Sequence, residues 1–192
     1  MQEQISQSKQ QVRDKKQDKH RLLNTVLIFT LLVVISFGAY GINKKFAELT
    51  YEEHKTSEIA QIVKDEGYKK CIYSDSRGLQ TIGFGHLMLS TDKFKCITPI
   101  KAVSLLRLDY SYAEASVSNK YLWAYGEVRL VLINMTYQMG ATGVSKFKKT
   151  LDYLHSEEYD LAAGELLNSR WAAQTPNRAA RLAGRIMAIP NQ

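Results

Sequence analysis

Residues 22–42 most constrain what this chain can fold into, because they read LLNTVLIFTLLVVISFGAYGI and contain no charged side chain. A transmembrane helix needs about 20 consecutive, mainly apolar residues. A helix buried in a globular core would show a polar stripe along its length, and this run shows none. The run therefore predicts a transmembrane helix or a signal sequence.

The charges on either side of this run predict its orientation. Residues 1–21 hold six Lys or Arg against three Asp or Glu, whereas only Lys44 and Lys45 directly follow the run. Because positive residues stay preferentially on the cytoplasmic side, we expect a cytoplasmic tail over residues 1–21 and export of everything after residue 42. The small residues of Ala39-Tyr40-Gly41 leave signal-peptide cleavage open, although a leading region of this length is long for a signal peptide.

The remainder of the chain predicts one folded domain. Residues 43–55 are polar and charged and indicate a tether or an irregular helix, and residues 56–192 have the length of a single domain. The formal net charge of +7 suits an anionic polymer such as cell wall. The sequence has no basic stripe with interleaved aromatic residues and no glycine-rich phosphate loop, which argues against nucleic acid as a partner.

Local patterns predict a mainly helical α+β domain. Ser57 as N-cap and Gly67 as a stop bound a first helix. The β-prone runs CIY and LQTIGF flank the turn sequence SDSRG, which predicts a hairpin with Asp75 at its tip. Thr98 followed by Pro99 opens a second helix. The expected helices after the hairpin cover residues 98–116, the apolar core run EVRLVLINMTYQM, and about residues 145–157, 160–169 and 175–188.

Two acids border the predicted hairpin in a way that suits glycoside hydrolysis. That reaction uses one protonated carboxyl group to assist the leaving oxygen and one charged carboxylate to handle water. Glu66 ends the first predicted helix, Asp75 lies nine residues later, and Thr81 on the returning strand adds a hydroxyl that can orient water. Such spacing also arises by chance in several per cent of chains, so spacing alone is suggestive only.

The two cysteines, Cys71 and Cys96, both lie in the part of the chain that we expect to be exported, where disulfides persist. A bridge between them would close a loop of about 26 residues and add roughly 3.5 kcal/mol in the chain-entropy view. Two buried thiols are the alternative. Two isolated cysteines and four scattered histidines give no ligand spacing, so we expect no metal site.

Three separated motifs resemble the phage-type lysozymes. The stretch EGYKKCIYSDSRGLQTIGFGHLM at residues 66–88 closely resembles their Glu-x8-Asp-x5-Thr catalytic segment. The stretches INMTYQMGATGVSKF and SRWAAQTPNRAAR resemble two later helices of that family in the same order. The resemblance covers about residues 56–188 and implies a lysozyme-like fold, with a helical body and a small β-hairpin lobe.

This resemblance implies inverting hydrolysis of the β-1,4 bond between N-acetylmuramic acid and N-acetylglucosamine in peptidoglycan, without a cofactor. Glu66 would be the general acid, Asp75 would hold or activate the attacking water, and Thr81 would position that water. The family contacts its substrate at positions that match Leu87, Tyr137, Gln138 and Thr150.

The resemblance also implies supporting roles around these residues. Arg178 is expected beside Glu66, and His86 is expected to be a structural histidine because the mechanism gives it no task. Glu165 stands where the enzyme of T-even phages has an asparagine in its cleft.

With its apolar run, the chain also resembles signal-anchor-release endolysins. That implies a host inner-membrane anchor at residues 22–42, a cytoplasmic N-terminus, a periplasmic catalytic domain and later release, with a holin or pinholin as a suggested partner. Residues 22–42 contain no cysteine, which excludes a thiol switch in the anchor. Permanent anchoring and a non-catalytic protein that binds peptidoglycan or regulates lysis remain alternatives.

Overall fold

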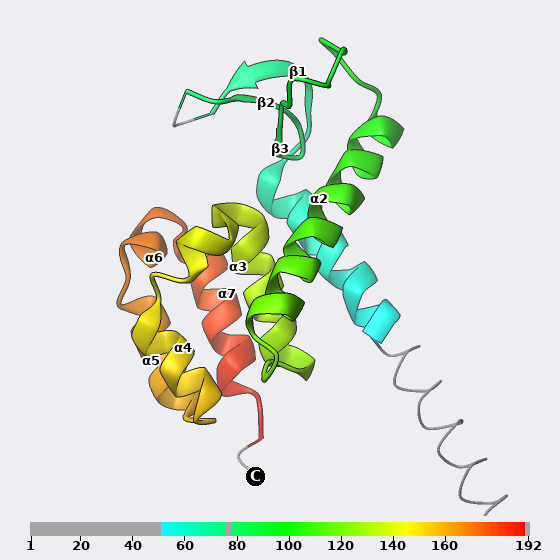
Figure 1. Ribbon diagram of the computed structural model, residues 1–192. Coiled ribbons are helices and arrows are strands. Elements are labelled where there is room, and N and C mark those ends of the chain that lie inside the picture. The colour runs from blue at the N-terminus through cyan, green and yellow to red at the C-terminus, as the bar shows by residue number, and fades with distance from the viewer. Residues whose placement is uncertain (1–50, 76–77, 191–192) are drawn as a thin grey trace, which may run out of the picture. The chain divides into compact units, whose positions relative to one another are not determined.

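The computed structural model describes residues 51–75 and 78–190 (Figure 1). The predicted tail at residues 1–21, the predicted membrane segment at 22–42 and residues 43–50 of the predicted tether lie outside the described part. Within the described part, no helix combines the length and the apolar character that crossing a bilayer requires.

The first described helix covers residues 51–66 and begins earlier than predicted. The prediction of Ser57 as its N-cap was wrong, because residues 51–56 already belong to the helix. In the turn before Ser57, Lys55 Nζ donates to Glu114 Oε2 at 2.9 Å, and directly after Ser57 the buried Glu58 accepts from Arg185 Nη1 at 2.6 Å. Such long-range pairs have no signature in the local sequence.

A three-stranded antiparallel sheet follows, in the order β1 (Lys69–Ser74), β2 (Gln80–Gly83) and β3 (His86–Leu87). The predicted hairpin is confirmed by β1 and β2, which pair antiparallel. Strand β3 was not predicted, because a segment of two residues is too short to show the alternation of apolar and polar side chains that indicates a strand. Cys71 and Cys96 form a disulfide, and residues 95–97 bond to β1 through Ile72 N to Lys95 O at 3.0 Å and Ile97 N to Lys70 O at 2.8 Å.

The rest of the domain is helical, as predicted. Thr98 caps α2 by accepting from Lys101 N at 3.2 Å, and α2 continues past the predicted end. Near its C-terminal end, α3 is kinked at Gly140, which has a φ of 74°. The short helix α6 was not predicted as a separate element. The bounds are α2 (Pro99–Lys120), α3 (Gly126–Val144), α4 (Lys148–His155), α5 (Tyr159–Leu167), α6 (Arg170–Gln174) and α7 (Pro176–Met187).

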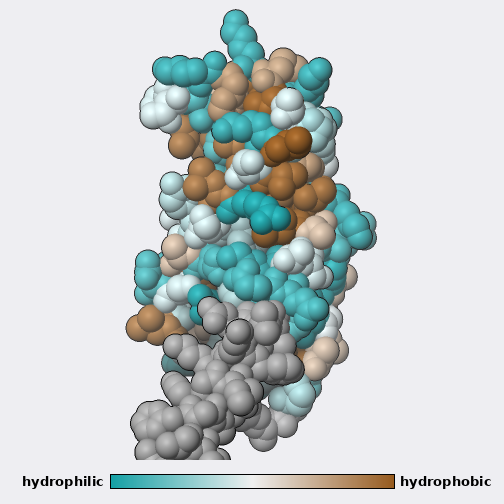
Figure 2. Space-filling view, turned by 90° about the vertical axis from the view of Figure 1, so that its right-hand side faces the viewer, coloured by the Kyte–Doolittle hydropathy of each residue, from teal (hydrophilic) through white to brown (hydrophobic). Residues whose placement is uncertain are grey.

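Helix α2 joins the sheet to a helical body formed by α3 to α7 (Figure 1). It packs along α3, while α5 and α7 pack against each other. The α3 segment that was predicted to be central is buried at Leu130 to Thr136, in agreement with its apolar composition. On the face shown in Figure 2, apolar side chains also reach the surface. Among single residues, Ile100 on α2 is 81% exposed. The fold is therefore α+β, with a small sheet at one end of a helical body.

Candidate active site

Glu66 is the last residue of the first described helix. Gly67 ends that helix, as predicted, with a φ of 66° in the left-handed region that glycine tolerates. The Glu66 side chain remains 22% exposed, and its Oε1 accepts from Arg178 Nη1 at 2.9 Å. Gly85, between β2 and β3, lies against the same carboxylate, because a Cβ at that position would be 3.5 Å from Glu66 Oε2. The helix end and the sheet thus meet at this acid.

Asp75 lies directly after β1, in the turn of the hairpin. Its backbone N–H donates to Leu79 O at 2.9 Å, and its carboxylate Oδ1 accepts from Leu79 N at 2.8 Å. These two bonds hold Asp75 across the turn and aim its side chain.

Thr81 lies in the middle of a row across the sheet. It pairs with Tyr73 on β1 and with Leu87 on β3, so the three side chains share one face. Thr81 is buried and its hydroxyl donates to Leu79 O at 3.1 Å, whereas Leu87 is 44% exposed.

Tyr73 lies within the electrostatic reach of both acids. Burial raises the pKa of the Tyr73 phenol, and the negative charges of Glu66 and Asp75 raise it further. A phenolate would be repelled by both carboxylates, which requires both to be near the Tyr73 ring. Because Thr81 is the cross-strand neighbour of Tyr73, the structure brings Glu66, Asp75 and Thr81 to one region.

Arg178 ties this region to α7. Its side chain is buried, and besides Glu66 it lies near Asp65, with Nε 3.3 Å from Asp65 Oδ2. Arg181, one turn later, donates to the same Asp65 oxygen at 2.5 Å. Sequence reasoning expected Arg178 here but missed Asp65 and Arg181. Two features of the sequence could have indicated these residues. Asp65 directly precedes Glu66, and Arg181 follows Arg178 by three residues, which places both arginines on one side of α7.

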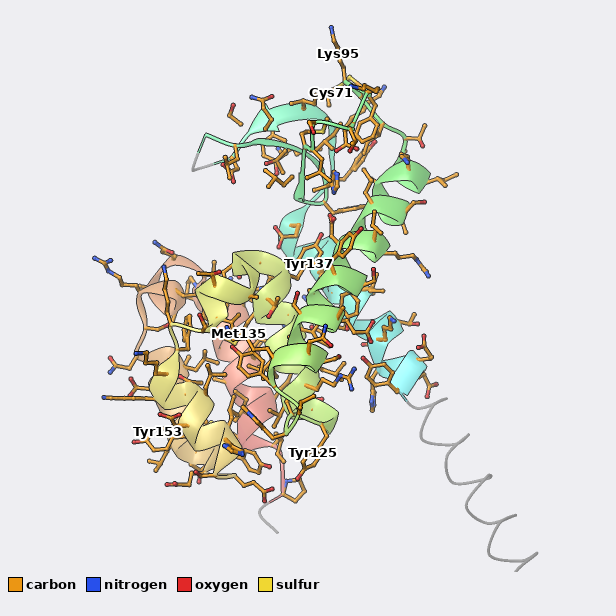
Figure 3. The ribbon with its side chains drawn as sticks, in the orientation of Figure 1. Cys71, Lys95, Tyr125, Met135, Tyr137 and Tyr153 are labelled. Atoms are coloured by element: carbon orange, nitrogen blue, oxygen red, sulfur yellow. A yellow bond between two sulfur atoms is a disulfide. The ribbon has the colours of Figure 1, made fainter. Side chains whose placement is uncertain are left out.

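Tyr137 and Gln138 connect the sheet to the helical body. The Tyr137 hydroxyl donates to Phe84 O at 2.7 Å, in the segment that leads to Gly85 (Figure 3). Burial raises the pKa of Tyr137, and the charges of Asp109 and Glu66 act in the same direction. Gln138 Oε1 accepts from Trp171 Nε1 at 2.9 Å.

A groove of about 670 Å³ begins beside these residues, between the end of α3, the start of α4 and α6. We call it the basic groove, because cationic side chains outnumber the single acid Glu165 along it. Thr150 lies in its wall and is buried, so its hydroxyl is less accessible than a substrate-contacting role suggests. The charged and aromatic residues that line the groove are Lys146, Lys148, Lys149, Glu165, Arg170 and Trp171.

His86 takes part in a separate cluster. It is buried, with Nδ1 at 2.8 Å from Asp109 Oδ2 and Nε2 at 3.3 Å from Asp92 Oδ2. The hydrogen bond to Asp109 raises the pKa of His86, against the opposing effect of burial, and Asp92 adds to the increase. This arrangement is that of a structural histidine that links β3, the following loop and α2.

Among residues 51–75 and 78–190, no group of three His, Cys, Asp or Glu side chains is placed to bind a metal ion. The site itself contributes two carboxyl groups and a hydroxyl at the junction of sheet and helices.

Comparison with known proteins gives matches over most of the domain. The phage lysozyme family model matches residues 63–186. Probable T4-type lysozyme 2 of Dictyostelium discoideum is 34% identical over 146 residues, which are 62% of this chain and 86% of that protein. Probable T4-type lysozyme 1 of the same organism is 32% identical over 155 residues, 66% of this chain and 91% of that protein. The pre-baseplate central spike protein Gp5 of Enterobacteria phage T4 is 25% identical over 168 residues, which are 73% of this chain and 29% of that protein.

Proposed function

The chain belongs to the phage lysozyme family and is a lysozyme-type glycoside hydrolase, and on that premise we propose how its site works and where it acts. The substrate is peptidoglycan, cleaved at the β-1,4 bond between N-acetylmuramic acid and N-acetylglucosamine. The relatives named as T4-type lysozymes support this substrate. The observation that carries the assignment is the convergence of Glu66, Asp75 and Thr81 around the row of Tyr73.

In the proposed reaction, Glu66 gives its proton to the glycosidic oxygen as the bond to the sugar breaks. A water molecule attacks the anomeric carbon from the opposite face and yields a product of inverted configuration. Asp75, held in the turn by Leu79, accepts the proton of that water. The Thr81 hydroxyl, on the same face of the sheet, positions the water.

Arg178 holds the proposed acid in place. Its guanidinium is 2.9 Å from Glu66, so the residue that gives the proton is also part of an ion pair. We infer that the bound sugar covers the exposed 22% of Glu66 and brings the glycosidic oxygen within reach of its carboxyl group. The pH–rate profile should lose its acidic group in Glu66→Gln, and its persistence would contradict this role.

The basic groove offers the room for the rest of the polymer. Leu87 is exposed on the edge strand of the sheet, Tyr137 on α3 bonds to the sheet segment at Phe84, and Gln138 bonds to Trp171 in the groove wall. The lysines along the groove suit a polymer that carries acidic peptides. In this proposal Leu87, Tyr137 and Gln138 line the path of the substrate, the buried Thr150 supports the groove wall, and no cofactor takes part.

The test of the function uses the full chain in a neutral detergent, with purified sacculi as substrate. We expect release of new reducing ends by the parent chain and at least a hundredfold slower release by Glu66→Gln, the usual scale for loss of general acid catalysis. Proton NMR of the first products should show the inverted anomer. A retained anomer, or equal rates for the two chains, would refute the mechanism.

We further propose that residues 22–42 anchor the enzyme in the host inner membrane, with residues 1–21 in the cytoplasm and the catalytic domain in the periplasm. The charge-free run and the basic residues before it support this placement. Later release into the periplasm would let the enzyme reach the wall and lyse the host, with a holin or pinholin as the trigger.

Permanent anchoring is the second candidate, because the run is rich in Leu, Ile, Val and Phe. Membrane fractionation of cells that express the full chain, before and after collapse of the membrane potential, separates the two. Transfer of intact chain to the soluble fraction supports release, continued sedimentation with membranes supports permanent anchoring, and a shortened soluble chain shows signal-peptide cleavage.

A further inference from the structure

One face of α4 extends the basic groove toward the far end of the helical body. This face carries Lys148 and, three, four and seven residues later, Leu151, Asp152 and His155. Such a spacing places side chains on the same side of a helix. They span about 10 Å along the helix axis. Lys148 already lines the basic groove, so this face leads directly away from it.

A second hollow lies along this face. It measures about 370 Å³ and is bordered by all four α4 residues together with Lys120, Tyr121 and Trp123 from the end of α2 and the segment after it. Lys148 lines both the basic groove and this hollow, so the two are neighbours along one continuous surface.

An aromatic pair closes the far end of this hollow. The rings of Trp123 and His155 are stacked with centroids 4.9 Å apart, and Tyr121 meets Trp123 edge-on at 5.9 Å. His155 is exposed, and Trp123 is half-buried. We call this feature the aromatic shelf, defined by Tyr121, Trp123 and His155.

The surface continues beyond the aromatic shelf. A third hollow of about 370 Å³ is lined on one side by Trp123 and His155 and on the other by residues that include Leu122, Tyr125 and Glu157. Tyr125 is 62% exposed and donates to Glu157 Oε1 at 3.0 Å. Figure 3 shows Tyr125 at the end of the body opposite the sheet. Trp123 and His155 of the shelf therefore border two hollows, each with aromatic and charged walls.

We propose that the aromatic shelf and its two hollows form a second glycan-binding site that holds the sugar chain of the wall polymer beyond the basic groove. Stacked rings offer flat apolar surface to the C–H faces of sugars, while the polar groups around them bond to hydroxyl and acetamido groups. This proposal rests on the proposed function, because it takes the same polymer as its ligand.

The charges around the shelf favour a sugar chain over a polyanion. Lys120 and Lys148 are matched by Asp152 and Glu157, so the site carries no net cationic field. A phosphate backbone would meet two carboxylates there, whereas the near-neutral glycan backbone meets donors and acceptors of both kinds. The site would hold the enzyme on an insoluble wall between cleavage events.

Binding of purified sacculi tests the proposal without relying on catalysis. The full chain carrying Glu66→Gln is kept in neutral detergent and sedimented with sacculi over a range of concentrations. Adding Trp123→Leu and His155→Ala together should weaken binding about tenfold, the loss that follows when an aromatic anchor of an interface is truncated. Peptide-free glycan strands should compete with sacculi for the Glu66→Gln chain. They should compete less effectively for the chain that also carries Trp123→Leu and His155→Ala.

Tyr112→Ala is the matched control, because Tyr112 is a 63% exposed aromatic residue that lines none of these hollows. It should change binding less than twofold. His155→Ala alone keeps the test valid if loss of the half-buried Trp123 disturbs folding, since His155 is exposed. Unchanged binding by a folded His155→Ala variant would overturn the proposal. Failure of the unsubstituted chain, with Glu66 intact, to release reducing ends from sacculi would overturn the proposed function instead.

Discussion

Replacing Arg178 with Met tests the ion pairs that hold the candidate active site together. Arg178 is 5% exposed and lies 2.9 Å from Glu66 and 3.3 Å from Asp65, so its loss leaves Glu66 without its buried cationic partner. Breaking a buried pair by removing one member costs about 3–5 kcal/mol. We expect the lower end, about 3 kcal/mol, because Glu66 keeps some contact with solvent and Asp65 keeps Arg181.

Thermal unfolding of the full chain in neutral detergent measures this loss. For a chain of this size, 1 kcal/mol corresponds to about 2–4 °C, so Arg178→Met should lower Tm by about 6–12 °C. Arg181→Met is the control, since Arg181 is 29% exposed and its loss leaves Asp65 with Arg178. It should cost about 1 kcal/mol. Equal shifts for the two variants would refute the reasoning that burial decides the size of the effect.

Three further predictions concern the sheet and its links. Gly85→Ala and Gly78→Ala should each cost about 1–2 kcal/mol in the free energy of unfolding, since both glycines have φ near +80° or above. Only Gly85→Ala should also lower the hydrolysis rate; equal rates would show that the contact at Gly85 is unimportant. The bond to Asp109 raises the pKa of His86 in the folded protein, so protonated His86 stabilises the fold fully below about pH 6.5. This stabilisation is lost as the pH rises through the pKa of His86 in the folded protein. Tm of His86→Gln across pH 5–9 should therefore lack the decline that the parent shows, and parallel curves would contradict the assignment. Cys71→Ser should lower stability by roughly 3.5 kcal/mol, measured as Tm against the untreated and reduced parent, and no effect of reduction would show that the bridge is unimportant.

Local signals predicted most of the elements. The hairpin followed from two β-prone runs around a turn, and the start of α2 followed from Thr98 and Pro99, whose roles depend on residues within one helical turn. The first helix was predicted to start too late. Its turn before Ser57 is tied to a distant helix by the bond from Lys55 to Glu114, and Glu58 is bonded to Arg185. Those partners are distant in the sequence, so no local pattern reveals them.

The motif residues of the candidate site were singled out from the sequence, whereas some of the charged residues around them were missed. The motif at residues 66–88 singled out Glu66, Asp75 and Thr81, and the structure places them around Tyr73, which the sequence did not single out. Asp65 and Arg181 were missed, although both belong to the ion pairs around Arg178. A charged residue on a helix is usually solvated, so only its neighbours in the folded structure show that it forms an ion pair.

The sequence by itself determined the family resemblance, the order of the elements, and the charge-free run at residues 22–42, because spacing, periodicity and composition are properties of neighbouring residues. Only the tertiary structure decided that Arg181 lies beside Asp65 at 2.5 Å across 116 residues of chain. It also brought Trp123 and His155 into one aromatic shelf. Contacts of this kind arise when helices pack, and their free energy depends on burial and distance rather than on position along the chain.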